Sequence, residues 1–357
     1  MSLVWLSYFV RKLSGSLTQK FPLSTRHRMD RDVLAKRTRL RLPISLAAVK
    51  LATVLTVYCL LGTLAVRADI VISGYSAATN DRFTNSSQFI AGGYNLSGIG
   101  QNGTGRWATL ISRNVIVSAN HFAPSGPITF FSSNNPASTG FSYTVTNSLR
   151  IGNSDIWLGR LNRVVDASIS NYEFATEVLT GTNPNPNITL APAGTYQNDV
   201  GWMVGLSPAS RPAPQDQAFG RNRISGYSQN VSFLGGLTNA LVLINDAPPT
   251  NNNPSNFVQY EAVVQSGDSG APMFVATSAT SLKLLGINSF LLTNSTTGAP
   301  VGSGVSYLGN SALQIQSFIS VSTVPEPNAI FLVVFAGAAF YGRSKTIKVQ
   351  LALIKRH

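Results

Sequence analysis

Residues 265–272 read Gln-Ser-Gly-Asp-Ser-Gly-Ala-Pro, a run of small residues with apolar, strand-forming residues on both sides. Such a run suits a tight loop that presents the Ser269 hydroxyl and points backbone N–H groups at whatever that hydroxyl attacks. A serine hydroxyl is a weak nucleophile until a neighbouring base takes its proton. The chain has three histidines, and His27 and His357 lie in terminal segments that look like processing signals. His121 is therefore the candidate base.

The basic charge of the chain belongs to its two ends. The sequence has 27 basic and 14 acidic residues, but only ten of the basic ones lie between Asp69 and Pro327, against twelve acidic ones. A nearly neutral middle lacks the basic surface that nucleic-acid binding requires. We therefore expect no nucleic-acid partner.

Residues 1–68 have the layout of a secretory signal peptide with a long basic n-region. Basic residues up to Arg41 precede an apolar run from Ile44 to Val66, and Val66-Arg67-Ala68 supplies small or branched residues at the cleavage positions. We expect signal peptidase to cut after Ala68. Two alternatives stay open: translation begins at Met29, or the apolar run remains in the membrane as an anchor.

The middle of the chain reads as all-β, because short apolar runs alternate with clusters of turn-forming residues. This pattern is typical of a sandwich or a barrel. The segment Asn183–Asn187, rich in Asn and Pro, is the best internal linker, and an apolar pattern predicts one helix at Asn310–Ile319. The only cysteine, Cys59, lies in the predicted signal peptide, so the folded domain relies on its core rather than on disulfides.

Two further motifs complete a candidate catalytic set. The β-branched run Val115–Ser118 is a strand that delivers His121 just after its end, and Asp155 stands at the start of an apolar strand. A carboxylate in that position can hold the imidazole in one tautomer and stabilise its charged form. Asp166 is the rival carboxylate, but no apolar strand follows it.

These motifs, in the order histidine, aspartate, serine, resemble those of the chymotrypsin-like (trypsin-fold) serine proteases. The similar segments are Ser-Ala-Asn-His-Phe at 118–122, Asp-Ile at 155–156 and Gly-Asp-Ser-Gly at 267–270. The resemblance covers roughly residues 105–320. It implies two packed six-stranded antiparallel β-barrels with a short C-terminal helix. The protease domain would be 69–323, with the first barrel at about 85–182 and the second at about 188–320.

The resemblance also implies a role for each catalytic residue. Ser269 is the nucleophile, His121 is the general base and then the general acid, and Asp155 orients the imidazole. The backbone N–H groups of Gly267 and Ser269 form the oxyanion hole. The substrate is a protein or peptide, and the mechanism needs no metal ion or other cofactor.

Asp268 is expected to pair with a different group from the one that its counterpart in the family binds. In the family this carboxylate pairs with a new N-terminus made by zymogen activation. The Ile-Val-Gly-Gly start of the activated chain is absent here, and its nearest match, Ile90-Ala-Gly-Gly93, lies too close to His121. The sequence therefore argues against activation by propeptide cleavage and for an internal partner of Asp268.

Five residues line the substrate site by this resemblance. The residue six positions before the nucleophile lies at the base of the pocket for the side chain before the scissile bond, and here it is Val263. Ser289 and Phe290 belong to the strand that pairs with the substrate backbone. Leu291 replaces a glycine of the pocket entrance, and Gly304 is the second wall residue. These residues predict cleavage after small or medium apolar side chains.

Residues 324–345 resemble the PEP-CTERM sorting tail of exported bacterial proteins. They contain Pro-Glu-Pro, a short apolar segment and basic residues, and a basic tail follows at 346–357. The resemblance implies an exosortase as processing partner, transient membrane insertion through both termini, and an extracellular or envelope-associated product. The alternative to an exported endopeptidase is a non-catalytic surface or matrix protein that keeps the protease-like fold for binding.

Overall fold

The computed structural model describes residues 69–181, 190–234, 236–248 and 254–321. The predicted signal peptide, the linker candidate Asn183–Asn187, the sorting tail and the basic tail lie outside the described residues. Among the residues that are described, no helix has the length and apolarity to cross a membrane.

The first barrel is a seven-stranded antiparallel sheet in the order β6-β5-β2-β3-β4-β8-β7. Its end strands, β6 and β7, are separated in the sequence by Thr144 alone, so they are two halves of one bent strand. Thr144 completes the join, because its carbonyl accepts from Asn162 N at 2.9 Å. The sheet thus closes into a barrel of six strands. The bounds are β2 (Ile99–Asn102), β3 (Trp107–Leu110), β4 (Val115–Ala119), β5 (Ile128–Phe131), β6 (Gly140–Tyr143), β7 (Val145–Arg150) and β8 (Ile156–Leu161).

The second barrel closes in the same way. Its strands follow the order β11-β10-β15-β16-β17-β13-β12, and only Ile224 and Ser225 separate the end strands β11 and β12. Ser225 N donates to Val242 O at 2.9 Å, which continues the ladder through the bend. The bounds are β10 (Val200–Gly205), β11 (Ala218–Arg223), β12 (Gly226–Phe233), β13 (Gly236–Ile244), β15 (Pro272–Ala276), β16 (Leu282–Thr293) and β17 (Pro300–Tyr307).

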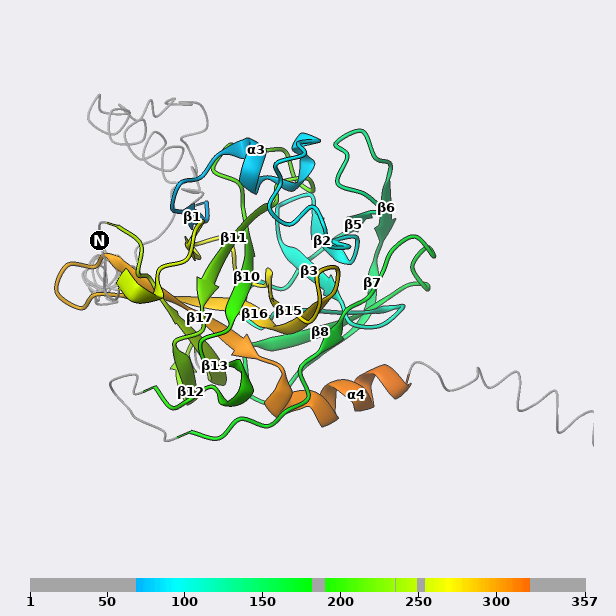
Figure 1. Cartoon of the computed structure of the whole chain (residues 1–357). Helices are drawn as coiled ribbons and strands as arrows, with labels where there is room; N and C mark the ends of the chain where they lie inside the picture. Colours follow the sequence, from blue (N-terminus) through cyan, green and yellow to red (C-terminus); the bar gives the residue numbers. More distant parts are fainter. Residues whose placement is uncertain (1–68, 182–189, 235, 249–253, 322–357) are drawn as a thin grey trace, which may run out of the picture. The chain divides into compact units, whose positions relative to one another are not determined.

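Short elements join the barrels (Figure 1). Strand β9 (Glu173–Phe174) pairs in parallel with β16, and β1 (Val71–Ile72) pairs with β14 (Ala262–Val263). The α-helices of the described residues are α3 (Ala77–Asn80) and α4 (Ala312–Ser320), with the 3-10 turn η5 (Gly309–Ser311) before α4. The predicted all-β class, with two barrels and a short C-terminal helix, is confirmed. The helix predicted from Asn310 begins two residues later, because the first turn of that segment is 3-10.

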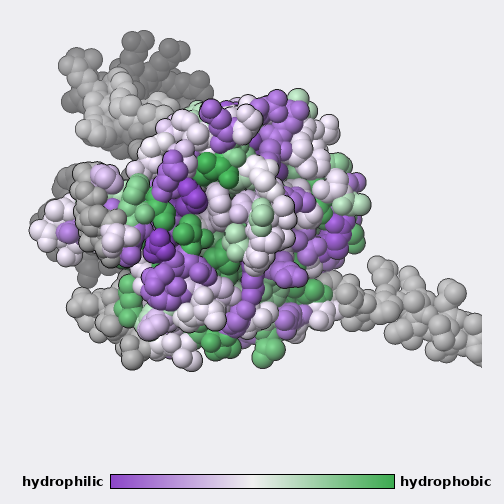
Figure 2. Space-filling view, viewed as in Figure 1, coloured by the Kyte–Doolittle hydropathy of each residue, from purple (hydrophilic) through white to green (hydrophobic). Residues whose placement is uncertain are grey.

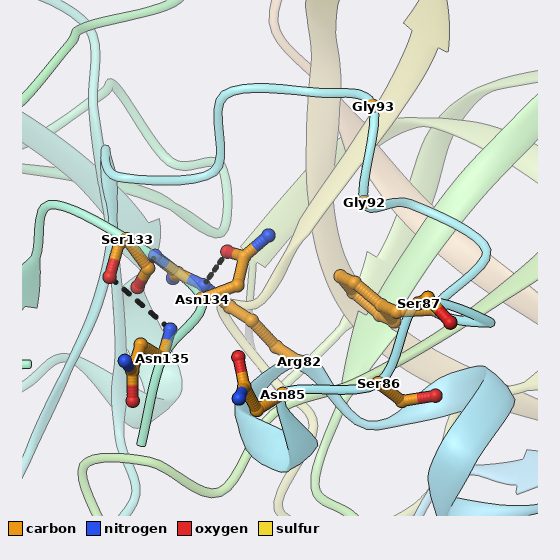
Figure 3. A pocket seen from close by; sticks show the side chains of 10 residues that line it. Arg82, Asn85, Ser86, Ser87, Gly92, Gly93, Ser133, Asn134 and Asn135 are labelled. Atoms are coloured by element: carbon orange, nitrogen blue, oxygen red, sulfur yellow. Dashed lines mark hydrogen bonds between the residues drawn. The ribbon is translucent and has the colours of Figure 1, made fainter. Parts of the chain in front are cut away.

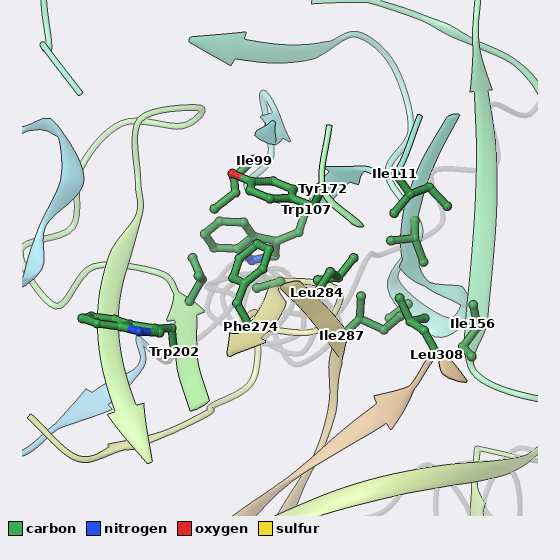
Figure 4. Close-up of a cluster of buried hydrophobic side chains, with 14 of the residues drawn as sticks. Ile99, Trp107, Ile111, Ile156, Tyr172, Trp202, Phe274, Leu284, Ile287 and Leu308 are labelled. Carbon is green, nitrogen blue, oxygen red and sulfur yellow. The ribbon is translucent and has the colours of Figure 1, made fainter. Parts of the chain in front are cut away.

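A hydrophobic cluster shared by the two barrels forms the centre of the domain (Figure 4). Trp107 and Leu158 of the first barrel, Trp202 and Phe274 of the second, and Phe318 of α4 all belong to it. Each barrel also has an interior cluster of its own. Strands between two apolar regions are buried on both faces, which explains why every residue of β4 is buried and all but Ser118 are apolar.

The surface in view mixes hydrophilic and hydrophobic residues without one dominant apolar patch (Figure 2). A mixed surface of this kind is ordinary for a folded protein.

Candidate active site

His121 lies where β4 ends and the 3-10 turn η2 (Asn120–Phe122) begins. Pairing of β4 with β8 fixes the backbone that leads to it, with Val117 opposite Leu158. The His121 side chain is 19% exposed, so the ring is accessible from one side. The strand that the sequence predicted to deliver this histidine thus does so.

Asp155 precedes β8, and its 5% exposure marks a nearly buried carboxylate. Both carboxylate oxygens lie 2.9 Å from His121 Nδ1, and Oδ1 also accepts the backbone N–H of His121 at 3.0 Å. Because an ionised carboxylate only accepts hydrogen bonds, Nδ1 carries the proton of the neutral imidazole. Nε2 is then left as an acceptor.

Ser269 lies in the loop before β15 of the second barrel, between Gly267 and Gly270. These glycines have φ of 106° and 87°, in the left-handed region that residues with a Cβ rarely adopt. The Ser269 Oγ lies 2.9 Å from His121 Nε2, so its hydroxyl donates to the imidazole. The structure thus brings His121, Asp155 and Ser269 into one hydrogen-bonded chain across the two barrels.

The loop around Ser269 is held from three sides. The Asp268 carboxylate is fully buried and accepts from Leu206 N and Gln265 N, both at 2.7 Å. Gly270 N donates to Asn288 O at 2.8 Å. The indole N–H of Trp107, on the first barrel, donates to Gly267 O at 3.2 Å. The expected internal partner of Asp268 is therefore a pair of backbone amides.

Ile70 occupies the space beside Asp268. It is 1% exposed, and its N–H donates to Leu206 O at 3.1 Å, while Leu206 N binds the carboxylate. Both side chains pack over Gly205, where an added Cβ would be 2.6 Å from Ile70 Cβ and 2.7 Å from Asp268 Oδ1. The Ile70 side chain thus packs beside this carboxylate.

The N–H groups of Gly267 and Ser269 are the predicted oxyanion donors. Within the described residues no protein acceptor binds either amide, whereas the neighbouring amides of Asp268, Gly270 and Ala271 all have acceptors. Two amides without a protein partner beside a nucleophile are what binding of a developing oxyanion requires.

The residues predicted to line the substrate site lie on adjacent elements. Val263 is 2% exposed in β14, and Leu291 and Phe290 are half-buried on β16. Ser289 is buried as the bulged residue of β16, and its Oγ lies 2.6 Å from Ser306 Oγ.

The cross-strand partner of Leu291 is Ser303, a residue that the sequence motifs did not single out. Gly304 pairs with Phe290 and packs against its ring, whereas Ser303 pairs with Leu291. The Ser303 Oγ also accepts from Val264 N at 3.1 Å, which ties β17 to the residue after Val263. Sequence reasoning missed Ser303, because a bulge at Ser289 shifts the register by one residue.

Asp166, the rival carboxylate, is exposed and caps its own turn. Its Oδ1 accepts from Ser168 N at 2.9 Å and from Ser168 Oγ at 2.7 Å, and these hydrogen bonds lower the pKa of its carboxyl. No hydrogen bond or ion pair in the described part of the chain joins it to His121, whereas Asp155 makes three hydrogen-bond contacts with that residue.

A polar cavity of about 600 Å³ lies apart from these residues (Figure 3). Its wall includes Arg82, which is buried and has no carboxylate partner among the described residues. The guanidinium donates to Asn134 Oδ1, to Gln217 Oε1 and to backbone carbonyl groups, and burial lowers its pKa to about 10. The predicted site residues are not among those that line this cavity.

No protein-family model matches the chain, and no curated protein sequence does either. The solved structures that it matches include the passenger domain of plasmid encoded toxin, an autotransporter enterotoxin of enteroaggregative Escherichia coli. That match has 20% identity and a TM-score of 0.37, over 62% of this chain and 22% of the toxin chain. This chain therefore spans about a fifth of the passenger domain.

Two smaller proteins match over most of their own length. The murine norovirus NS6 protease, an inactive mutant, is 13% identical over 59% of this chain and 89% of its own, with a TM-score of 0.34. A mutant of human heparin binding protein is 12% identical over 65% of this chain and 95% of its own, with a TM-score of 0.41.

Proposed function

We propose that the protein is an exported serine endopeptidase that works through an acyl-enzyme. The observation that carries the proposal is the hydrogen-bonded chain from Asp155 through His121 to Ser269, with 2.9 Å between donor and acceptor at both links. A nucleophile, a base and a group that orients the base are the minimum set for this chemistry.

The reaction begins when Ser269 Oγ attacks the peptide carbonyl carbon and His121 Nε2 takes the hydroxyl proton. The carbonyl oxygen becomes an oxyanion, which the N–H groups of Gly267 and Ser269 bind. The intermediate collapses, the C–N bond breaks, and the amine leaves with the proton from His121. Water then repeats the sequence on the ester and regenerates the Ser269 hydroxyl.

Asp155 supports both halves of this cycle by keeping the proton of the neutral imidazole on Nδ1. It also stabilises the imidazolium that forms when His121 is protonated. A non-catalytic binding protein would have no chemical use for this arrangement, which is why the rival hypothesis ranks second.

A fluorophosphonate probe tests the proposed activity directly, because it labels only an activated serine. We expect the wild-type protein to be labelled and Ser269→Ala to remain unlabelled while keeping the same circular dichroism spectrum. An unlabelled but folded wild-type protein, or equal labelling of the variant, would favour the non-catalytic binding protein.

The specificity that we propose is cleavage after small or medium apolar residues. Val263 offers no carboxylate to a Lys or Arg side chain. Burying such a cation in an apolar pocket without a partner costs on the order of several kcal/mol of binding free energy. Leu291 would narrow the pocket against Phe and Tyr. Profiling on a peptide library tests this: a preference for Arg or Lys would contradict the role of Val263, and one for large aromatics that of Leu291.

We also propose that signal peptidase and an exosortase process the chain, so that the product is extracellular or bound to the envelope. The motivating features are Val66-Arg67-Ala68 and the 324–345 tail. Intact mass spectrometry of the native exported protein should give a chain that begins at Asp69 and ends near Pro325–Pro327. A product that retains His357 would refute the sorting step.

A further inference from the structure

An open groove lies between the C-terminal helix and the first barrel. It has a volume of about 370 Å³ and is bounded by residues 149–152, at the end of β7 and in the following turn, and by α4 with Val321. Its wall is mainly apolar, and two of the apolar residues are unusually open, with Leu149 44% and Val321 65% exposed. A hollow lined by apolar residues that are open to solvent has the form of a binding groove.

Arg150 gives this groove one positive charge. Its Nε donates to Ser154 O at 2.8 Å and its Nη2 donates to Asn153 O at 3.1 Å, so two carbonyl groups hold the guanidinium in place. No acidic residue lines the groove, and no carboxylate of the described residues forms an ion pair with Arg150. The groove therefore suits a ligand that combines apolar groups with one carboxylate.

The chain itself supplies such a segment directly after the groove. Residues 322–327 read Ser-Thr-Val-Pro-Glu-Pro, and Glu326 is the only acidic residue after Val321. Since Val321 lines the groove, only five residues lead from its wall to Glu326. Five extended residues span at most about 18 Å, which is longer than a groove of this volume is wide. The carboxylate can therefore reach Arg150 within the same molecule.

The two prolines of this segment favour binding. A residue that precedes proline is restricted to extended conformations, so Val324 and Glu326 lose little freedom when they bind. Short proline-rich segments are for this reason common ligands of apolar grooves that contain an aromatic ring. The groove contains one such ring, that of Phe318.

We propose that residues 324–327 bind this groove in the same molecule, with Val324 and the prolines against its apolar wall and the Glu326 carboxylate on Arg150. A bound segment is shielded, so a processing enzyme must bind it more tightly than the groove does before it can act there. The inference concerns binding alone and does not depend on the chemistry at Ser269.

The test is photo-cross-linking in the full-length chain, purified before any C-terminal processing. A benzophenone amino acid replaces Leu149, and mass spectrometry of the digest measures the fraction of chains in which it is joined to residues 322–328. We expect these residues to be the main target, within one chain. The same benzophenone at Val164, which is 59% exposed on the first barrel but does not line the groove, should give little of this product.

A charge exchange tests the ion pair. Glu326→Lys lies outside the described domain, and it should lower the cross-linked fraction about threefold, the size expected for losing a partly exposed ion pair. Adding Arg150→Glu to it should restore the fraction. An unchanged fraction in Glu326→Lys, or equal products from Leu149 and Val164, would overturn the proposal. Cross-links only between two chains would overturn it too, because they would make the groove an interface between copies.

Discussion

Asp155 makes three contacts with His121, and each uses an acceptor oxygen. Asp155→Asn replaces one oxygen with an NH2 donor, which favours the imidazole tautomer protonated on Nε2 and so removes the base. We expect kcat on a peptide substrate to fall by about four orders of magnitude at neutral pH. The control is Asp166→Asn, which should leave kcat unchanged. The reverse result would mean that Asp166 orients the imidazole.

Asp268 leads to a second prediction at the scale of one residue. Each of its oxygens accepts a backbone amide, and asparagine would present a donor to one of them. Asp268→Asn should release the Ser269 loop and lower kcat about 100-fold, comparable to losing an oxyanion donor. Asp216→Asn is the matched control, because Asp216 is also buried and accepts Ser207 N at 2.9 Å. Equal kcat losses in both variants would indicate general destabilisation.

The sequence was sufficient to select the three residues that the structure joins by hydrogen bonds, because each one lies in a local pattern. His121 was the only candidate left, and Asp155 and Ser269 have distinctive neighbours. The contacts of Trp107 and Ser303 could not be predicted, because each depends on a pairing between distant parts of the chain. Trp107 binds a carbonyl 160 positions away, and Ser303 faces Leu291 only because of a bulge.

At the scale of elements, α4 connects the end of the second barrel to the first. Arg160 of β8 donates to Phe318 O at 2.7 Å and lies 4.8 Å from the centre of the Phe318 ring. Phe318→Ala should lower the free energy of unfolding by about 3 kcal/mol, the low end for a buried phenylalanine. Urea denaturation measures this, and exposed Leu313→Ala on the same helix should cost well under 1 kcal/mol, about the size of an ordinary surface substitution.

The ion pair between Glu177, which follows β9, and Lys283 of β16 predicts that the stability of the fold depends on pH in the acid range. Burial alone would raise the pKa of Glu177, but hydrogen bonds from Lys283 and Tyr196 outweigh it and lower the pKa to about 2. The ionised carboxylate therefore stabilises the fold above an unfolded pKa near 4.5, and this contribution is lost as the pH falls towards 2. Acid denaturation followed by circular dichroism should show a smaller stability loss between pH 4.5 and 2 in Glu177→Gln. Identical acid profiles would contradict this prediction.

At the scale of the whole domain, the candidate active site lies between barrels that share one hydrophobic cluster. Neither barrel can separate from the other without exposing that cluster to water. We therefore expect the described domain to unfold in one transition. Fluorophosphonate labelling, tryptophan fluorescence and far-ultraviolet circular dichroism should share a single urea midpoint. Loss of labelling at a clearly lower urea concentration would mean that the barrels separate before either one unfolds.

The two-barrel arrangement was predicted from the resemblance rather than from the strands. Apolar runs and turns indicated many short strands, but they left a sandwich and a barrel equally open. The difference lies at Thr144 and at Ile224-Ser225, where one strand bends and pairs with two different neighbours. Neither position carries a sequence signal as strong as the motif around Ser269, because the bend is set by which strands lie on each side.

Those two bends also bear on solubility. An open sheet ends in strands whose free N–H and C=O groups can recruit a strand from another molecule, and proteins often protect such edges with lysine. This chain has few charged residues, 11% of its sequence, and Lys283 is the only lysine between Asp69 and Pro327. Because one bent strand closes each barrel, the unpaired edges that would need such protection are largely removed. We therefore expect barrel closure to reduce aggregation through strand edges in this domain, which has few charged residues.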